Sequence, residues 1–247
     1  MNYNIYNQLL TAKQSGKKQF ALLLDPDKIN LDTLPELIQL SQKAKVSYIF
    51  IGGSLMLNNN LDLFITIIKS ECNIPVLLFP GSSLQLSYKA DALLYLSLIS
   101  GRNADLLIGK HVETAPFIKR SGLEVLPTGY MLIDGGVATS VSYMSNTNPI
   151  PASKSDIAVC TAIAGELLGL KLIYMDAGSG AANPISKNMI NAVANNIDIP
   201  LIIGGGIRTV QSAVAAANAG ADIIVVGNAI EKDSRLITAI AESINSI

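Results

Sequence analysis

The amino-acid sequence predicts a single α/β domain over residues 1–247, built as a (β/α)₈ TIM barrel whose third crossover helix is irregular or missing. Eight short apolar runs recur along the chain, amphipathic stretches of helical length separate most of them, and glycine-rich segments follow the last two runs. Strands that alternate with helices form parallel βαβ units. The eight runs and the two final glycine segments favour a closed barrel over an open, doubly wound sheet.

The strand candidates are short, mostly apolar runs of the kind that form strands buried on both faces. They are residues 20–24, 47–51, 75–79, 92–98, 125–133, 172–175, 200–203 and 223–226. The helix candidates, which carry apolar residues at helical spacing, are residues 31–45, 61–70, 104–120, 155–168, 186–196, 210–218 and 231–244. Only residues 81–89 separate the third strand from the fourth, which is short for a crossover helix.

One connection is unusually long. Residues 134–154 are rich in glycine, serine, asparagine and proline, and we expect them to form a mobile loop over the active site. A surface insertion without fixed structure is the alternative.

The composition excludes several classes of protein. Hydrophobic residues make up 49% of the chain and charged residues 15%, as expected of a sheet covered on both faces. The 18 basic and 19 acidic residues leave no basic field, so we expect no nucleic-acid partner. No apolar run approaches the ~20 residues of a membrane span, and the first residues lack the pattern of a secretory signal. Cys72 and Cys160 have no metal or redox spacing, so we expect two buried packing residues in a cytoplasmic protein.

The final glycine segments predict a phosphate site. Gly205 and Gly206 follow the seventh strand candidate, and Gly227 with Asn228 follows the eighth. Glycine lets backbone N–H groups approach an anion closely, because no side chain intervenes. The loops after strands seven and eight of a barrel commonly bind phosphate, so these four residues are candidate substrate ligands.

The sixth strand candidate ends in a third segment of this type. Its candidate substrate-binding residues are Tyr174, Met175, Asp176, Ala177, Gly178, Ser179 and Gly180. Asp176 is placed to accept a proton from a substrate hydroxyl and Tyr174 to orient the substrate, so both are candidate catalytic residues. An ordinary turn with a helix N-cap is the structural alternative.

Other strand ends supply weaker candidates. Asp25 could hold Mg²⁺, which prefers one or two carboxylates with substrate phosphates, or could belong to an Asp-Pro turn. Ser54 follows two glycines and could ligate a metal or a phosphate. Arg102 could bind phosphate oxygens at the barrel mouth or be a solvated surface residue. His111 falls within a helical stretch, so we expect a structural or surface role.

These segments, in this order, resemble the geranylgeranylglyceryl phosphate synthases, which are grouped with heptaprenylglyceryl phosphate synthases. The resemblance is carried by residues 24–28, 51–54, 100–103, 127–130, 174–180, 204–207 and 226–228, and it runs nearly end to end. The ordered set is more specific than any single loop. It implies a modified barrel with an irregular third helix, in agreement with the short segment 81–89.

The resemblance implies transfer of a prenyl group from a prenyl diphosphate, with geranylgeranyl diphosphate expected, to the free primary hydroxyl of sn-glycerol 1-phosphate. The implied cofactor is Mg²⁺, with Asp25 and Ser54 at the metal site. The glycerol phosphate would lie against residues 174–180 and the two final glycine segments. An amphiphilic substrate and product imply transient contact with a membrane surface, and the apolar outer helices favour a homo-oligomer.

The chain departs from this family at Asp176, where glutamate is usual. Aspartate is shorter by one methylene, so either the backbone compensates or Asp176 is not the base. Two other functions stay open: another phosphate-binding barrel enzyme, such as an isomerase, a lyase or a flavin enzyme, and a barrel that binds glycerol phosphate or prenyl lipid without catalysis. Tyr88 and Tyr95 could line a prenyl groove, although core packing is the simpler expectation for both.

Overall fold

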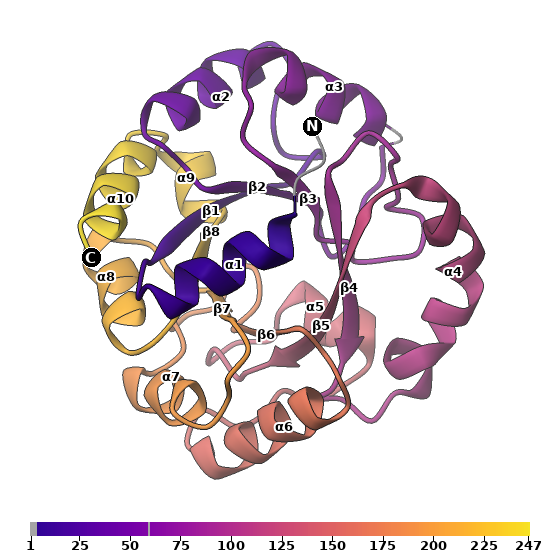
Figure 1. Cartoon of the computed structure of the whole chain (residues 1–247), viewed down its shortest axis with the longest axis vertical. Coiled ribbons are helices and arrows are strands. Elements are labelled where there is room, and N and C mark those ends of the chain that lie inside the picture. Colours follow the sequence, from indigo (N-terminus) through magenta and orange to yellow (C-terminus); the bar gives the residue numbers. More distant parts are fainter. Residues whose placement is uncertain (1–3, 59) are drawn as a thin grey trace.

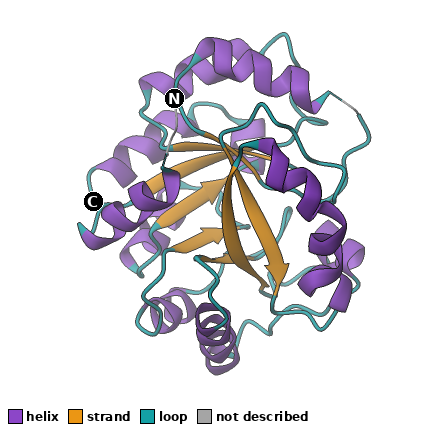
Figure 2. Ribbon diagram, turned by 45° about the vertical axis from the view of Figure 1, so that its right-hand side comes forward, coloured by secondary structure: helices purple, strands orange, loops and turns teal. Residues whose placement is uncertain are grey.

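The computed structural model describes residues 4–58 and 60–247, and its strands close into a parallel barrel in the order β1 to β8 (Figures 1 and 2). The strands are β1 Gln19–Leu24, β2 Tyr48–Ile51, β3 Val76–Leu78, β4 Ala92–Leu98, β5 Glu124–Leu132, β6 Leu172–Asp176, β7 Leu201–Gly204 and β8 Ile223–Val226. Pairing of β1 with β8, in the register Gln19 opposite Ile223, closes the barrel. The predicted fold is confirmed, and each strand lies within a residue or so of its expected place.

Helices surround the barrel (Figure 1). They are α1 Ile5–Gln14, α2 Leu34–Lys43, α3 Leu61–Glu71, the π-helical turn η1 Asp105–Gly109, α4 Lys110–Ser121, α5 Ser140–Ser145, α6 Ser155–Leu167, α7 Lys187–Ala194, α8 Val210–Asn218, α9 Asn228–Lys232 and α10 Leu236–Asn245. Residues 81–89 contain no helix, so the expected absence of a third crossover helix is confirmed.

The apolar residues form two layers. Side chains that point into the barrel, such as Phe50, Leu94 and Ile202, make one cluster, while alternate residues such as Ile49 and Leu93 pack outward against the helices. Most strands are therefore buried on both faces, which explains their nearly continuous apolar runs, while the middle of β4 is only half-buried.

Helix α1 was not predicted. Ile5 and Leu9 belong to the inner cluster, so α1 covers the amino-terminal end of the barrel, where Figure 1 shows it crossing the barrel (indigo). Its first turn is held by a residue far along the chain. The carboxylate of Glu124 accepts hydrogen bonds from the N–H groups of Ile5 at 2.6 Å and Tyr6 at 2.8 Å.

Three further expectations need correction. The predicted helix 231–244 is interrupted between α9 and α10, where Asp233 accepts hydrogen bonds from the backbone and side chain of Arg235. The connection 134–154 contains α5 and a parallel bridge between Ile133 and Ile150, so it is not an insertion without structure. Cys160 is exposed on α6 and Cys72 is only half-buried, so neither is a fully buried packing residue.

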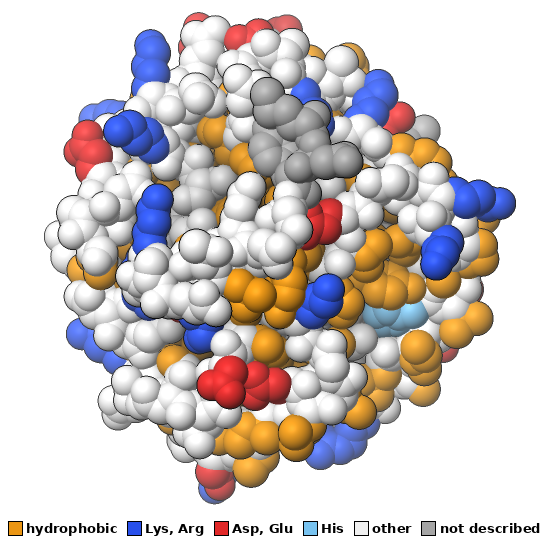
Figure 3. All heavy atoms as spheres, in the orientation of Figure 1, with side chains coloured by type: hydrophobic (Ala, Val, Ile, Leu, Met, Phe, Trp, Pro, Cys, Tyr) orange, Lys and Arg blue, Asp and Glu red, His pale blue; other side chains and the backbone are white. Residues whose placement is uncertain are grey.

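The surface shows little segregation of charge. On the face drawn in Figure 3, basic and acidic side chains are scattered, as expected for a net charge of −1. Among the described residues, no helix is both long and apolar enough to cross a membrane.

Candidate functional site

A cavity of about 1030 Å³ opens at the carboxyl ends of the strands and is lined by residues from all eight of them or from the loops that follow. This is the end of the barrel that carries active sites. Glycine-rich loops after β6, β7 and β8 form one wall. Another part of the cavity, called the apolar arm below, is lined by side chains of β4, η1 and α4 such as Leu96, Leu106 and Ile118. Residues 81–89, between β3 and β4, contain no helix, and residues 80–86 of this connection line the cavity.

The glycine wall is backbone packed against backbone. Gly178, Gly205 and Gly206 have φ angles of 87°, 78° and 69°, in the left-handed region that favours glycine. A Cβ atom built on Gly205 would lie 2.5 Å from an oxygen of Asp176 and 2.6 Å from the nitrogen of Gly178. These two loops therefore require glycine and leave their polar backbone open to a ligand.

Two side-chain contacts fix the wall. Asn228, at the start of α9, donates through Nδ2 to the hydroxyl of Ser179 at 2.9 Å and so links the loops after β8 and β6. The guanidinium of Arg208 donates to the carbonyl oxygens of Ala181 and Ala182, which links the loop after β7 to the loop after β6. The three loops therefore form one connected unit along the cavity wall.

Asp176 lies beside this wall and is buried. One carboxylate oxygen accepts a hydrogen bond from the hydroxyl of Tyr130 at 2.6 Å, and the other accepts from the N–H of Gly178 at 2.7 Å. Burial raises the pKa of Asp176 above its ordinary value, and the two hydrogen bonds oppose that rise. The result is a fixed carboxylate that holds a proton more readily than a solvated one.

Tyr174 lies between the polar wall and the apolar arm. Its ring stacks on Phe79, with centroids 4.9 Å apart, and meets Tyr130 edge to face at 5.6 Å. Burial, with a smaller contribution from the Asp176 carboxylate, raises the pKa of Tyr174 well above its ordinary value, so the phenol keeps its proton. In the described chain no residue hydrogen-bonds to this hydroxyl, which lines the cavity and is available to a substrate.

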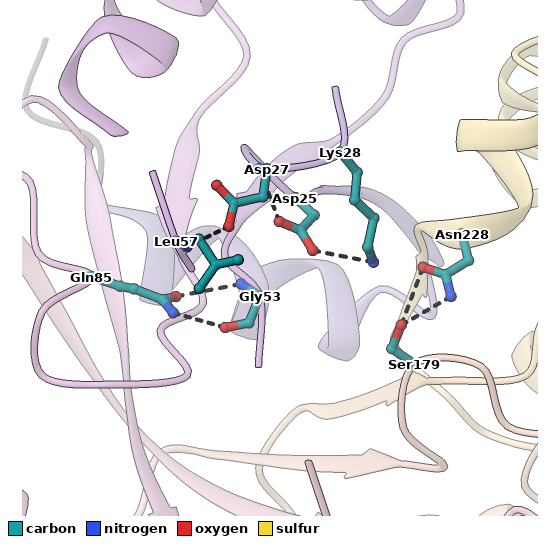
Figure 4. A network of polar contacts seen from close by, with 8 residues as sticks. All are labelled: Asp25, Asp27, Lys28, Gly53, Leu57, Gln85, Ser179 and Asn228. Atoms are coloured by element: carbon teal, nitrogen blue, oxygen red, sulfur yellow. Dashed lines mark hydrogen bonds and ion pairs between the residues drawn. The ribbon is translucent and has the colours of Figure 1, made fainter. Parts of the chain in front are cut away.

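The opposite side of the mouth carries Asp25 and Lys28 (Figure 4), and Ser54 also lines the cavity. The carboxylate of Asp25, directly after β1, lies 3.1 Å from the ammonium of Lys28. A Cβ atom on Gly53 would lie 2.9 Å from the same carboxylate, so the Gly53 backbone packs against it and Ser54 follows at the cavity wall. Asp25 and Ser54, which the resemblance places at a metal site, therefore both line this side of the cavity.

The donor set at this position is sparse. No group of three or more histidine, cysteine or acidic residues within the described ranges could hold a metal ion by itself. Glu231 is nearby, and burial raises its pKa while the charge of Lys28 lowers it. A divalent cation held at Asp25 would therefore need ligand oxygens from a bound substrate.

Some predicted residues lie outside the cavity. Met175 and Ala177 alternate with Tyr174 and Asp176 along the strand and are buried in the outer layer, so their side chains do not face the site. Arg102 is exposed and does not line the cavity, which confirms the surface alternative.

The apolar arm contains the single histidine. His111 and Tyr95 both line it and meet edge to face at 4.4 Å, and Nε2 of His111 lies 3.3 Å from the hydroxyl oxygen of Ser97. Burial lowers the pKa of His111, which favours the neutral ring in this apolar surrounding. Tyr88 is exposed, so core packing is wrong for that residue.

No role was predicted for Lys28, Arg208 or Gln85. Lys28 directly follows residues 25–27, and Arg208 directly follows residues 204–207. Their position next to a strand end could therefore have marked both as candidate site residues. Gln85 lies in the irregular segment after β3, where no periodicity or motif marks it. The structure places all three at the cavity.

Residues 13–244 match the PcrB family. A geranylgeranylglyceryl phosphate synthase of Chitinophaga pinensis is 56% identical over 246 residues, covering 100% of this chain and 98% of that protein. A synthase of the same name from Thermococcus kodakarensis is 42% identical over 221 residues, covering 89% and 87%. The crystal structure of (S)-3-O-geranylgeranylglyceryl phosphate synthase from Thermoplasma acidophilum, in complex with substrate sn-glycerol-1-phosphate, has a TM-score of 0.93 to this chain at 31% identity, covering 99% of this chain and 100% of that one.

Proposed function

The chain belongs to the PcrB family, and from that premise we propose that it joins a prenyl group from geranylgeranyl diphosphate to the free primary hydroxyl of sn-glycerol 1-phosphate. The reaction forms an ether and releases diphosphate. The main observation behind the proposal is that one cavity is lined by a glycine-rich wall, a buried carboxylate and an apolar arm. A relative with 31% identity binds sn-glycerol 1-phosphate in its crystal structure, which supports the choice of acceptor.

The glycine wall would bind the phosphate of the acceptor. Backbone N–H groups of Gly205, Gly206 and Gly227 have no side chain in front of them, so an anion can approach closely. Ser179 and Asn228 complete the same wall with a hydroxyl and an amide. In this position the glycerol moiety would extend toward Tyr174 and Asp176.

Asp176 would act as the general base. Its carboxylate takes the proton from the acceptor hydroxyl, whose oxygen uses its electron pair to form the new bond to the first carbon of the prenyl chain. The bond between that carbon and the diphosphate oxygen breaks, and its electron pair leaves with the diphosphate. Tyr130 donates to Asp176 and fixes the carboxylate, while the free hydroxyl of Tyr174 orients the acceptor.

The side of the mouth with Asp25 would receive the diphosphate. The Asp25 carboxylate already faces a cation, the Lys28 ammonium at 3.1 Å, and a single carboxylate with phosphate oxygens is a donor set that Mg²⁺ accepts. Asp25 and Ser54 would hold Mg²⁺ together with the substrate. When bound, the ion neutralises charge that develops on the leaving diphosphate.

The apolar arm would bind the prenyl chain. Its wall includes Leu93, Leu94, Leu96, Leu98, Leu106 and Ile118. These side chains offer no competing nucleophile to an allylic carbon as its bond to diphosphate breaks, and they exclude water from it.

The experiment that tests the proposal follows the oxygen of the acceptor. We expect sn-glycerol 1-phosphate labelled with ¹⁸O at its free primary hydroxyl to yield a labelled ether lipid and unlabelled diphosphate, as measured by mass spectrometry. Label in the released diphosphate, or loss of the label from the lipid, would contradict attack by that hydroxyl. Binding of both substrates without product would instead favour a protein that binds them without catalysis.

A further inference from the structure

Gln85 links two loops on the diphosphate side of the cavity. It lies in the helix-free segment after β3, and only 3% of its surface is exposed. Its Nε2 atom donates to the carbonyl oxygen of Gly53 at 2.8 Å, and its Oε1 atom accepts from the N–H of Gly53 at 3.4 Å (Figure 4). The same Oε1 atom accepts from the N–H of Gly81 at 3.0 Å. One side chain therefore hydrogen-bonds to the loops after β2 and after β3.

The two loops touch through their backbones. A Cβ atom on Gly81 would lie 2.2 Å from the carbonyl oxygen of Gly53, and one on Gly52 would lie 1.8 Å from that of Phe79. No side chain separates the loops, so their relative position depends on this close contact and on the Gln85 amide. A buried glutamine with its amide oxygen and nitrogen both bonded is a rigid link.

The loop after β2 is held at a second point further along. The carboxylate of Asp27 accepts hydrogen bonds from the N–H of Leu57 at 2.5 Å and of Asn58 at 3.1 Å. Between the two points lie residues 54–56, which line the cavity and include Ser54. Gln85 thus fixes the end of the loop that packs against Asp25, and Asp27 fixes the other end.

We propose that Gln85 is a positioning residue, which holds Gly53 and Ser54 at the distance from Asp25 that the diphosphate of the prenyl donor requires. The inference rests on the proposed function, since it assigns the diphosphate to this side of the cavity. Gln85 contributes to donor binding and has no effect on the acceptor, because the glycine wall is built from the loops after β6, β7 and β8.

Two variants of Gln85 and one matched control test the proposal. Gln85→Met keeps the length and burial but removes all three hydrogen bonds, and Gln85→Asn keeps the amide but is shorter by one methylene. Gln19→Met is the control, because Gln19 is also a buried glutamine, bonded through Nε2 to Tyr48 at 3.1 Å, but lies at the opposite end of the barrel. A merely structural role predicts the same behaviour for Gln19→Met and Gln85→Met.

The measurement is calorimetric titration with inorganic diphosphate and Mg²⁺ in saturating sn-glycerol 1-phosphate, and separately with sn-glycerol 1-phosphate alone. We expect Gln85→Met to weaken diphosphate binding about tenfold, the effect of losing roughly one strong hydrogen bond, while acceptor binding stays within about twofold. Gln85→Asn should show a smaller loss. Gln19→Met should bind both ligands as the unchanged protein does.

Hydrogen exchange supplies a second readout. The amides of residues 53–57 should exchange faster in Gln85→Met and not in Gln19→Met, because only the former frees the loop. Unchanged diphosphate affinity in both Gln85 variants, or equal weakening of both ligands, would overturn the positioning role while leaving the proposed function in place. Absence of diphosphate binding by the unchanged protein would instead overturn the proposed function, and the inference with it.

Discussion

Asp176 is the residue on which the proposed chemistry depends most. It is the last residue of β6, it is buried, and both of its oxygens accept hydrogen bonds from groups that are themselves fixed. A Cβ atom on Gly205 would lie 2.5 Å from one of these oxygens, so the Gly205 backbone packs close to the carboxylate. In the proposed function this carboxylate is the base, and its shorter side chain relative to glutamate makes its position against the glycine wall the point to test.

The raised pKa of Asp176 predicts an acid limb in the rate. Only the deprotonated carboxylate accepts a proton, so turnover should fall as the pH falls through its pKa, at a higher pH than for an ordinary aspartate near 3.8. Asp176→Asn should reduce kcat by about 100-fold or more and abolish that limb. The measurement is kcat against pH for both proteins.

Stability supplies the control for this variant. Because the pKa of Asp176 is raised on folding, its contribution to stability is complete below the unfolded-state pKa and is lost as the pH rises through the folded-state pKa. Asp176→Asn has no titrating carboxylate at this position. Its free energy of unfolding should therefore depend less on pH between the unfolded-state and folded-state pKa values of Asp176. Loss of activity together with a large loss of stability at neutral pH would contradict a catalytic role.

Gly205 tests the anion wall at the scale of one residue. In Gly205→Ala the new Cβ would meet Asp176 and the Gly178 nitrogen at about 2.5 Å, so the wall must open. We expect a loss in affinity for sn-glycerol 1-phosphate on the order of 100-fold, measured by calorimetry. Gly169→Ala is the matched control, because Gly169 has a similar φ of 87° but has no atom within 4 Å of that position. Equal affinity in the two variants would argue against the wall.

Asp25 tests the cation site. Asp25→Asn keeps the shape but removes the charge that faces Lys28, so Mg²⁺-dependent turnover should fall by about 100-fold while acceptor affinity is unchanged. Chelation of divalent ions should reduce the unchanged protein to the same residual rate. Asp32→Asn, at an exposed aspartate outside the cavity, is the control. Full activity of Asp25→Asn would refute the assignment of the metal.

At the scale of elements, α1 depends on β5. The Glu124 carboxylate bonds to two N–H groups at the start of α1, where a negative charge also interacts favourably with the helix dipole. We expect Glu124→Ala to cost about 1–2 kcal/mol in unfolding free energy. In a chain of this length that lowers Tm by about 2–8 °C, as measured by thermal unfolding.

Glu113→Ala provides the comparison for α1. Glu113 is exposed on α4 and pairs with Lys110 at 3.0 Å, and surface ion pairs of this kind contribute little. A Tm change as small in Glu124→Ala as in Glu113→Ala would contradict the dependence of α1 on β5.

The strands could be predicted because burial on both faces leaves a local signal, a continuous apolar run. Helix α1 could not, since its apolar residues are few and its partner Glu124 is 118 or more residues away. The break between α9 and α10 depends on the local pairing of Asp233 with Arg235, which helical periodicity does not register.

The site residues also divide into those with a local sequence signal and those without one. Asp25, Asp176 and the final glycines could be predicted because a parallel barrel brings all strand ends to one mouth. Side chains alternate between the two faces of a strand, so Tyr174 and Asp176 of β6 face inward while Met175 faces outward. The sequence prediction did not use this alternation and included all of residues 174–180. Gln85 was not predictable, because its role comes from contacts between two irregular loops.

At the scale of the whole molecule, the proposed function assigns acceptor, diphosphate and prenyl binding to different parts of one cavity. In the proposed function the acceptor would bind to the loops after β6 to β8, the diphosphate beside the loops after β1 and β2, and the prenyl chain along β4 and α4. Self-association and transient membrane contact stay predictions.

The most direct test of this arrangement is diphosphate release from geranylgeranyl diphosphate with Mg²⁺, compared among sn-glycerol 1-phosphate, its enantiomer and no acceptor. A fixed anion wall beside a fixed base accepts only one hand of glycerol phosphate, so we predict release with sn-glycerol 1-phosphate and release at the acceptor-free rate with the enantiomer. Equal release with all three, or none with any, would contradict the proposed prenyl transfer.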